Sequence, residues 1–94
     1  MNDVEINKDA NGYGSFIIHH ENQPAGEMTF QLSGNKITVD HTEVEPEFEG
    51  KGLAKKMFLE MIDYARENKL KVIANCSYVK AQMQKNKDQY ADVS

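Results

Sequence analysis

The sequence predicts an α+β fold: a four-stranded antiparallel meander, an amphipathic helix, a parallel fifth strand and a short C-terminal helix. Two patterns carry this prediction. Before residue 45, apolar and polar residues alternate in short runs separated by turn residues, which is typical of half-buried strands. Between residues 52 and 68, apolar residues recur every three or four positions, which is typical of one helix face.

The first four elements are predicted strands that cover residues 4–8, 13–20, 25–32 and 36–44. Asn11-Gly12 and Ser33-Gly34-Asn35 are turn signals, and the segment Glu21–Pro24 should end the second strand. Because these connections are short, the four strands most simply pair as an antiparallel meander.

A single long helix is predicted from Gly52 to Asn68. Its apolar residues share one face: Leu53, Ala54, Met57, Phe58, Met61, Ile62 and Ala65. The opposite face is charged, and Asn68 is expected to be a left-handed cap. From the rise per residue of an α-helix, its length should be roughly 25 Å.

The C-terminal part of the chain should add one strand and one helix. Leu70–Cys76 is a predicted strand with an apolar centre. Because a helix connects it to the fourth strand, the two strands should run parallel. Ser77 should cap a short helix from Tyr78 to Lys87, and the tail at residues 90–93 either docks or frays.

Composition and charge argue against several classes of function. A chain of 94 residues should form one domain, and its net charge of −4 disfavours nucleic acid or an anionic membrane as main partner. No apolar run reaches the roughly 18 residues of a membrane span. The single cysteine, Cys76, cannot form an internal disulfide, and the polar, acidic N-terminus is unlike a signal peptide. We therefore expect a cytoplasmic protein.

A glycine-rich turn before the predicted helix carries the strongest functional signal. From residue 44 the chain reads Val-Glu-Pro-Glu-Phe-Glu-Gly-Lys-Gly-Leu-Ala. Backbone N–H groups at such a helix start lack partners within the helix and attract anions, and no capping side chain stands immediately before Gly52. Three lysines add positive charge and three glutamates oppose it: Lys51, Lys55, Lys56, Glu45, Glu47 and Glu49. The alternative is a flexible turn that only lets the helix pack on the sheet. A Walker-type nucleotide site fits poorly, since Lys51 is followed by glycine rather than by Ser or Thr.

The segment Glu49-Gly50-Lys51-Gly52-Leu53-Ala54 resembles motif A of the GNAT superfamily of acyl-CoA-dependent N-acetyltransferases, usually written Gln/Arg-x-x-Gly-x-Gly/Ala. Gly52 and Ala54 fit this pattern, whereas Glu49 departs from it. The predicted order of elements is also similar to a subgroup of very small GNAT proteins that lack the helices between the first two strands and the final strand pair. The resemblance implies a GNAT-like fold, acetyl-CoA as co-substrate and an unidentified amine acceptor, either a small molecule or a protein.

The resemblance also implies which residues hold CoA. The backbone of the turn would cradle the pyrophosphate: Gly50, Lys51, Gly52, Leu53 and Ala54. Lys51 or Lys55 could add charge, and the strand end from Thr42 to Val44 would pair its backbone with the pantetheine arm. The fourth and fifth strands splay apart in this family, and the thioester lies between them. Asn75 could bond a pantetheine amide, or simply satisfy backbone groups at the strand end.

Acyl transfer from a thioester needs a base for the amine, an oxyanion donor and an acid for the thiolate. His41 is the first candidate for the base, although it could be an ordinary polar residue of the sheet surface. Glu43, two residues on, shares its face and could orient His41 or bind a cationic amine. A backbone N–H near Glu43 or Val44 could polarise the carbonyl.

Two further candidates follow the fifth strand. Cys76 could accept the acyl group covalently, or it could be a small buried hydrophobe. Tyr78 could protonate the leaving thiolate, in keeping with the family's use of the last short helix, or it could be an aromatic anchor of that helix.

Other functions remain open at this level. The chain could hold CoA as a non-catalytic binding module or sensor, or it could be a purely structural α+β protein. No metal is expected, because His19 and His20 are adjacent and point to opposite faces of a strand. An open cleft in so small a domain makes a homodimer plausible.

Overall fold

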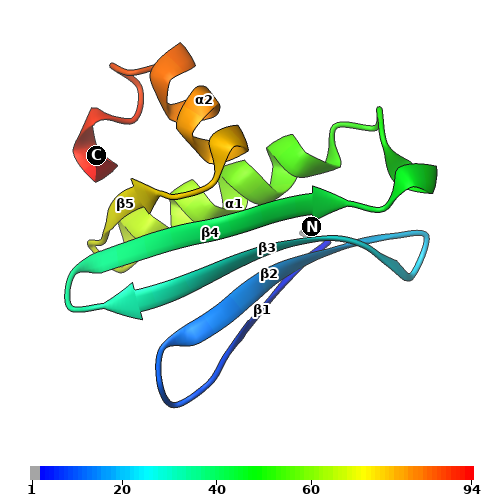
Figure 1. The fold of residues 1–94 in the computed structure, drawn as a ribbon, viewed down its shortest axis with the longest axis horizontal. Helices are drawn as coiled ribbons and strands as arrows, with labels where there is room; N and C mark the ends of the chain where they lie inside the picture. The colour runs from blue at the N-terminus through cyan, green and yellow to red at the C-terminus, as the bar shows by residue number, and fades with distance from the viewer. Residues whose placement is uncertain (1–2) are drawn as a thin grey trace.

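The computed structural model describes residues 3–94 as one five-stranded sheet with strand order β1-β2-β3-β4-β5 (Figure 1). The strands span Val4–Lys8 (β1), Tyr13–His20 (β2), Gln23–Ser33 (β3), Lys36–Val44 (β4) and Lys71–Ala74 (β5). Neighbours among the first four pair antiparallel, and β5 runs parallel to β4. Helices α1 (Leu53–Glu67) and α2 (Ser77–Lys85) lie on one side of the sheet, with short 3-10 turns η1 (Pro46–Phe48) and η2 (Ala91–Val93). The predicted α+β, GNAT-like fold is confirmed.

The core lies between α1 and the sheet face that the helix covers. The rings of Phe16 and Phe30 stand 5.0 Å apart, and Tyr64 of α1 meets Phe16 edge-on at 5.7 Å. The predicted apolar face of α1 is buried except for Ala54, which is half-buried: Leu53, Met57, Phe58, Met61, Ile62 and Ala65. Fully burying a large apolar side chain contributes about 1.5–3 kcal/mol, so this face anchors the helix. Within residues 3–94, no helix combines the length and apolar character needed to cross a bilayer.

The hairpin between β2 and β3 is tighter than the sequence predicted. Glu21 and Asn22 both have positive φ, 51° and 66°, as a two-residue type I′ turn requires. Strand β2 ends at His20 as predicted, but β3 begins at Gln23 and includes Pro24, so the predicted start of the third strand at residue 25 was two residues late. Pro24 lies opposite His19, next to a register shift in the ladder. An irregular ladder tolerates a residue that has no N–H to donate.

Three helix ends also differ from expectation. Asn68 has a φ of −101° and is not left-handed, while Lys69, one residue later, has a φ of 55°. The Asn68 side chain instead caps α1 by donating from Nδ2 to the Tyr64 carbonyl at 2.9 Å. At α2 the cap is Cys76 rather than Ser77, and the helix ends at Lys85, before Lys87.

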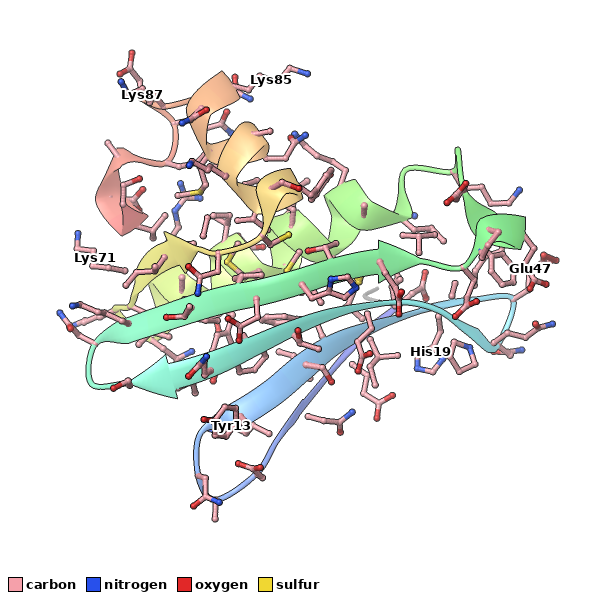
Figure 2. All side chains as sticks on the ribbon, in the orientation of Figure 1. Tyr13, His19, Glu47, Lys71, Lys85 and Lys87 are labelled. Atoms are coloured by element: carbon pink, nitrogen blue, oxygen red, sulfur yellow. The ribbon has the colours of Figure 1, made fainter. Side chains whose placement is uncertain are left out.

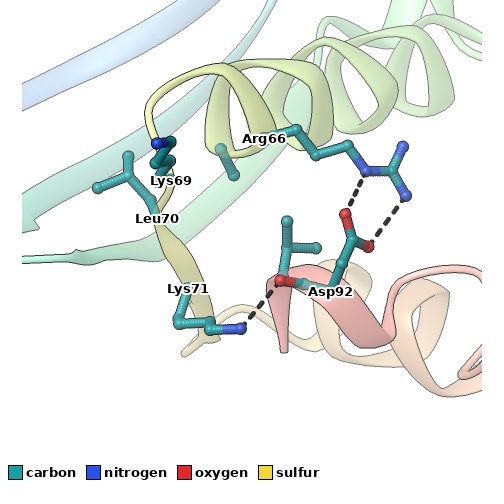
Figure 3. A pocket seen from close by; sticks show the side chains of 7 residues that line it. Arg66, Lys69, Leu70, Lys71 and Asp92 are labelled. Atoms are coloured by element: carbon teal, nitrogen blue, oxygen red, sulfur yellow. Dashed lines mark hydrogen bonds and ion pairs between the residues drawn. The ribbon is translucent and has the colours of Figure 1, made fainter.

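The C-terminal tail docks rather than frays. Tyr90 and Val93 are each 2% exposed, and the Tyr90 ring meets Phe58 of α1 edge-on at 5.2 Å. Polar contacts hold η2 from outside: Arg66 donates to both carboxylate oxygens of Asp92, and Lys71 Nζ donates to the Asp92 carbonyl at 2.9 Å (Figure 3). These contacts close off one side of a hollow at the C-terminal end of α1. The tail thus belongs to the packed domain.

Candidate functional site

A β-bulge at Asp40 decides which way the predicted catalytic strand points its side chains. Thr29 pairs with His41, but the next residue of β3, Phe30, pairs with Val39, so Asp40 is an extra residue in β4. Val39 is buried against the helices, and after the bulge Thr42 and Val44 turn to that side. His41 and Glu43 therefore project from the face that α1 and α2 leave uncovered. Tyr13 and His19 of β2 lie on the same uncovered side (Figure 2).

Strands β4 and β5 separate just beyond this bulge. They pair only from Lys36 to Val39, and a last hydrogen bond runs from the Asn75 N–H to the Val39 carbonyl at 2.9 Å. The Glu45 N–H donates to Ala25 of β3 at 2.8 Å. Because paired and unpaired positions alternate along an antiparallel ladder, the N–H and C=O groups of Thr42 and Val44 point away from β3. They face the stretch of the β4 edge beyond Val39 where β5 no longer pairs with it, called the opening below, and an extended amide chain could pair with this stretch.

The glycine-rich turn forms a second part of the site at the start of α1. Gly50 and Gly52 have φ values of 81° and 75°, a conformation that glycine adopts without strain. No side chain caps the helix, and within residues 3–94 the backbone N–H groups from Gly50 to Lys55 have no acceptor. They border a hollow of about 230 Å³, lined by Val44, Phe48, Glu49, Gly50, Gly52, Leu53, Ala54, Lys55 and Tyr78. Unsatisfied donors at a helix N-terminus suit a phosphate group.

The charges around this hollow are mixed. Lys55 Nζ donates to Gln82 Oε1 of α2 at 2.8 Å and lies 5.6 Å from the centre of the Phe58 ring, so it also ties the two helices together. Lys51 is exposed on the turn. Glu49 lines the hollow and contributes one negative charge. Because Gln82 is neutral, Lys55 keeps its positive charge at the lining of the hollow, where it adds to the backbone donors and the helix dipole.

Cys76 and Tyr78 lie on the helix side of β4, close to the opening. Cys76 is 8% exposed, and its Sγ donates to the Thr42 hydroxyl at 3.2 Å. Tyr78 is half-buried and borders the hollow of the glycine-rich turn. Burial raises the pKa of the Tyr78 phenol, and the neighbouring Cys76 thiol raises it further. The phenol therefore keeps its proton at neutral pH.

His41 and Glu43 form the other half of the site, on the uncovered face. Their side chains are 64% and 61% exposed, and His41 Nε2 lies 3.6 Å from Glu43 Oε2. Beside them is a shallow hollow of about 210 Å³, lined by Ile17, Pro24, Gly26, Glu27, Glu43 and Glu45. The four predicted catalytic residues therefore form two pairs. His41 and Glu43 lie on the uncovered side of β4, and Cys76 and Tyr78 lie on its helix side, with the opening between the two pairs.

Sequence reasoning missed Asp40. Its carboxylate accepts from Gln31 Nε2 of β3 at 3.1 Å and from Asn75 Nδ2, beyond β5, at 3.4 Å. Asn75 is separated from it by 35 residues, so no local pattern could have shown the contact. The only signal was an acidic residue in the middle of an otherwise regular strand pattern.

The comparison with protein families decides the classification. The model of the GCN5-related N-acetyl-transferase family matches residues 15–93. The chain belongs to this family. The match includes β4, the glycine-rich turn and α1, and it confirms the resemblance drawn from the residues of that turn.

Solved structures agree with this assignment. A GCN5-like protein from Staphylococcus aureus, solved by NMR, matches with a TM-score of 0.69 and 39% identity over 99% of this chain and 89% of its own. A ribosomal-protein-alanine N-acetyltransferase from Brucella melitensis biovar Abortus 2308 matches with a TM-score of 0.65 over 73% of this chain and 54% of its own. At 24% identity, the second match shows a shared fold. A comparison with curated proteins gives no match.

Proposed function

We propose that this GCN5-related family member transfers the acetyl group of acetyl-CoA to an amine acceptor. The observation that carries the proposal is the uncapped start of α1, where the N–H groups from Gly50 to Lys55 border a hollow and have no acceptor within residues 3–94. These donors would hold the pyrophosphate of CoA. Gly50 and Gly52 supply the positive φ that aims them, and Lys51 adds charge from outside.

The opening between β4 and β5 would receive the rest of the cofactor. The backbone of Thr42 and Val44 faces this opening and would pair with the amides of the pantetheine arm, as another strand would. Asn75, at the point where β5 ends, would bond the last of these amides. The thioester then lies beside Val44, whose N–H could bond the carbonyl oxygen as negative charge develops on it.

The acceptor would approach from the uncovered face. There His41 takes a proton from the amine, whose nitrogen attacks the thioester carbonyl carbon. A C–N bond forms, the C–S bond breaks, and the CoA thiolate takes a proton from Tyr78, whose phenol is protonated at neutral pH even at its ordinary pKa and has that pKa raised by burial. Glu43 would orient His41 or attract a cationic amine, since its carboxylate lies 3.6 Å from the imidazole.

A covalent route through Cys76 is the alternative chemistry at the same opening. In that route the thiolate of Cys76 takes the acetyl group from CoA, and the amine then attacks the new thioester. The hydrogen bond from Cys76 to Thr42 and its burial favour a packing role for this thiol. The two routes differ in whether removing the thiol abolishes turnover.

Calorimetry and a CoA-release assay together test the proposal. We expect saturable binding of CoA, and release of CoA from acetyl-CoA above background when an amine from a panel is added. Cys76→Ala should retain turnover and His41→Ala should lose most of it, whereas the reverse result supports the covalent route. No CoA binding at millimolar concentration refutes the proposal, and binding without turnover of any amine identifies a CoA-binding module instead.

A further inference from the structure

Asp40 connects three strands at the point where the sheet opens. It is the extra residue of the β4 bulge, and its two carboxylate oxygens accept from amides on either side: Gln31 Nε2 from β3 at 3.1 Å and Asn75 Nδ2 from the end of β5 at 3.4 Å. The Asn75 N–H makes the last bond between β4 and β5. One carboxylate thus holds both neighbours at the start of the opening.

The carboxylate also decides which end of the Asn75 amide is free. A carboxylate can only accept hydrogen bonds, so Asn75 must turn its NH₂ toward Asp40. The Asn75 Oδ1 then has no hydrogen-bond donor among residues 3–94. The other end of the side chain is therefore presented as an acceptor.

We infer that Asp40 is a positioning residue that orients Asn75 to accept a hydrogen bond from an amide N–H of the pantetheine arm. The inference rests on the proposed function, because it assumes that pantetheine enters the opening. It predicts that replacing Asp40 weakens binding of the pantetheine half of CoA and leaves binding of the pyrophosphate half unchanged. Replacing a residue that only stabilises the fold would weaken binding of both halves together.

The substitution Asp40→Asn separates these roles because it keeps the size and shape of the side chain. Its one carbonyl oxygen replaces two carboxylate acceptors, so the NH₂ group of residue 40 meets the NH₂ group of either Asn75 or Gln31, and one of these two amides must rotate. Asn75 is then no longer held with its oxygen presented to pantetheine. In the exchanged pair, Asp40→Asn with Asn75→Asp, residue 75 has one oxygen for the bond to residue 40 and another for the ligand.

The experiment measures binding of CoA and of ADP, which has the pyrophosphate but no pantetheine, by calorimetry. We expect Asp40→Asn to raise the Kd for CoA about tenfold, the effect of one lost hydrogen bond, and to leave the Kd for ADP unchanged. The exchanged pair should recover most of the CoA affinity. Asp63→Asn, on the exposed face of α1, is the matched control and should change neither Kd.

The outcomes separate failure of this inference from failure of the proposed function. Two results would show that the positioning role is wrong while the proposed function stands. In the first, Asp40→Asn binds CoA as tightly as the wild-type protein does. In the second, Asp40→Asn raises the Kd for ADP by the same factor as the Kd for CoA. If wild-type protein binds no CoA, both are wrong. In the free protein, the side-chain amide signal of Asn75 in a ¹H–¹⁵N spectrum should shift in Asp40→Asn, and an unchanged signal overturns the contact itself.

Discussion

Replacing Gly52 by alanine tests the anion site directly, and Gly34→Ala is its matched control. Both glycines have positive φ, 75° and 59°, and at both an added methyl group would meet no atom within 4 Å. Each substitution therefore costs only the strain of a left-handed side chain, about 1 kcal/mol. For a domain of this size, that strain should lower the melting temperature of both variants by about 4–8 °C.

Only Gly52→Ala should weaken CoA binding. Gly34 lies in the turn between β3 and β4, at the opposite end of β4 from the start of α1 (Figure 1). The new methyl group at Gly52 lies on the lining of the hollow and keeps a phosphate from its N–H donors. Loss of one hydrogen bond to a charged group costs about 1.5–3 kcal/mol, which raises the Kd roughly tenfold to a hundredfold.

The assay is calorimetric titration with CoA at a temperature where both variants are folded, with melting curves recorded in parallel. The two variants should match in melting temperature and differ in Kd. Equal Kd values for Gly34→Ala, Gly52→Ala and wild type would show that CoA does not bind at the start of α1, whatever the melting curves give.

Three further predictions follow from the same structure. His41→Ala should lower kcat by about 10²–10⁴, as expected for loss of a general base, with an unchanged melting temperature because the side chain is 64% exposed; an unaffected kcat would exclude His41 as the base. Phe58→Ala should lower the free energy of unfolding in urea by about 3–5 kcal/mol, since Phe58 is fully buried against Tyr90, and a loss below about 1 kcal/mol would contradict that packing. The hydrogen bond from Arg66 lowers the pKa of Asp92, so Asp92 stabilises the fold above the carboxyl's unfolded pKa and loses this effect as pH falls through its folded pKa. Asp92→Asn should accordingly be less stable than wild type in urea at neutral pH, and the gap should close as pH falls through the lowered folded pKa of Asp92. A gap that persists below that pKa would show that the ion pair is not the cause.

The sequence predicted the fold well because the signals for it are local. The strands at residues 4–8, 13–20 and 36–44 have the predicted bounds, and α1 begins and ends within one residue of its predicted range. Errors arose where a single backbone angle decides the outcome, as at Glu21, which adopts a positive φ although Gly and Asn are the usual residues there.

The site was predicted less completely because it depends on pairing between distant residues. Ile37, Val39, His41 and Glu43 read as one alternating face, and only the pairing with β3 shows that the bulge turns the last two outward. The contacts of Asp40 with Asn75 and of Cys76 with Thr42 join residues more than thirty positions apart. A hydrophobic periodicity reports only local structure and gives no sign of such contacts. The sequence therefore could not predict that His41 and Glu43 lie on one side of β4 while Cys76 and Tyr78 lie on the other.

The opening beside β4 has a consequence for solubility. An unpaired strand edge is a template on which another chain can add a strand, and so it is a hazard for aggregation. From residue 43 to residue 49, every second residue is a glutamate: Glu43, Glu45, Glu47 and Glu49. Glu43 lies in the last part of β4 and Glu45 directly follows the strand, so these two like charges at the end of the exposed edge would repel a second copy, as charged gatekeeper residues do beside aggregation-prone strands.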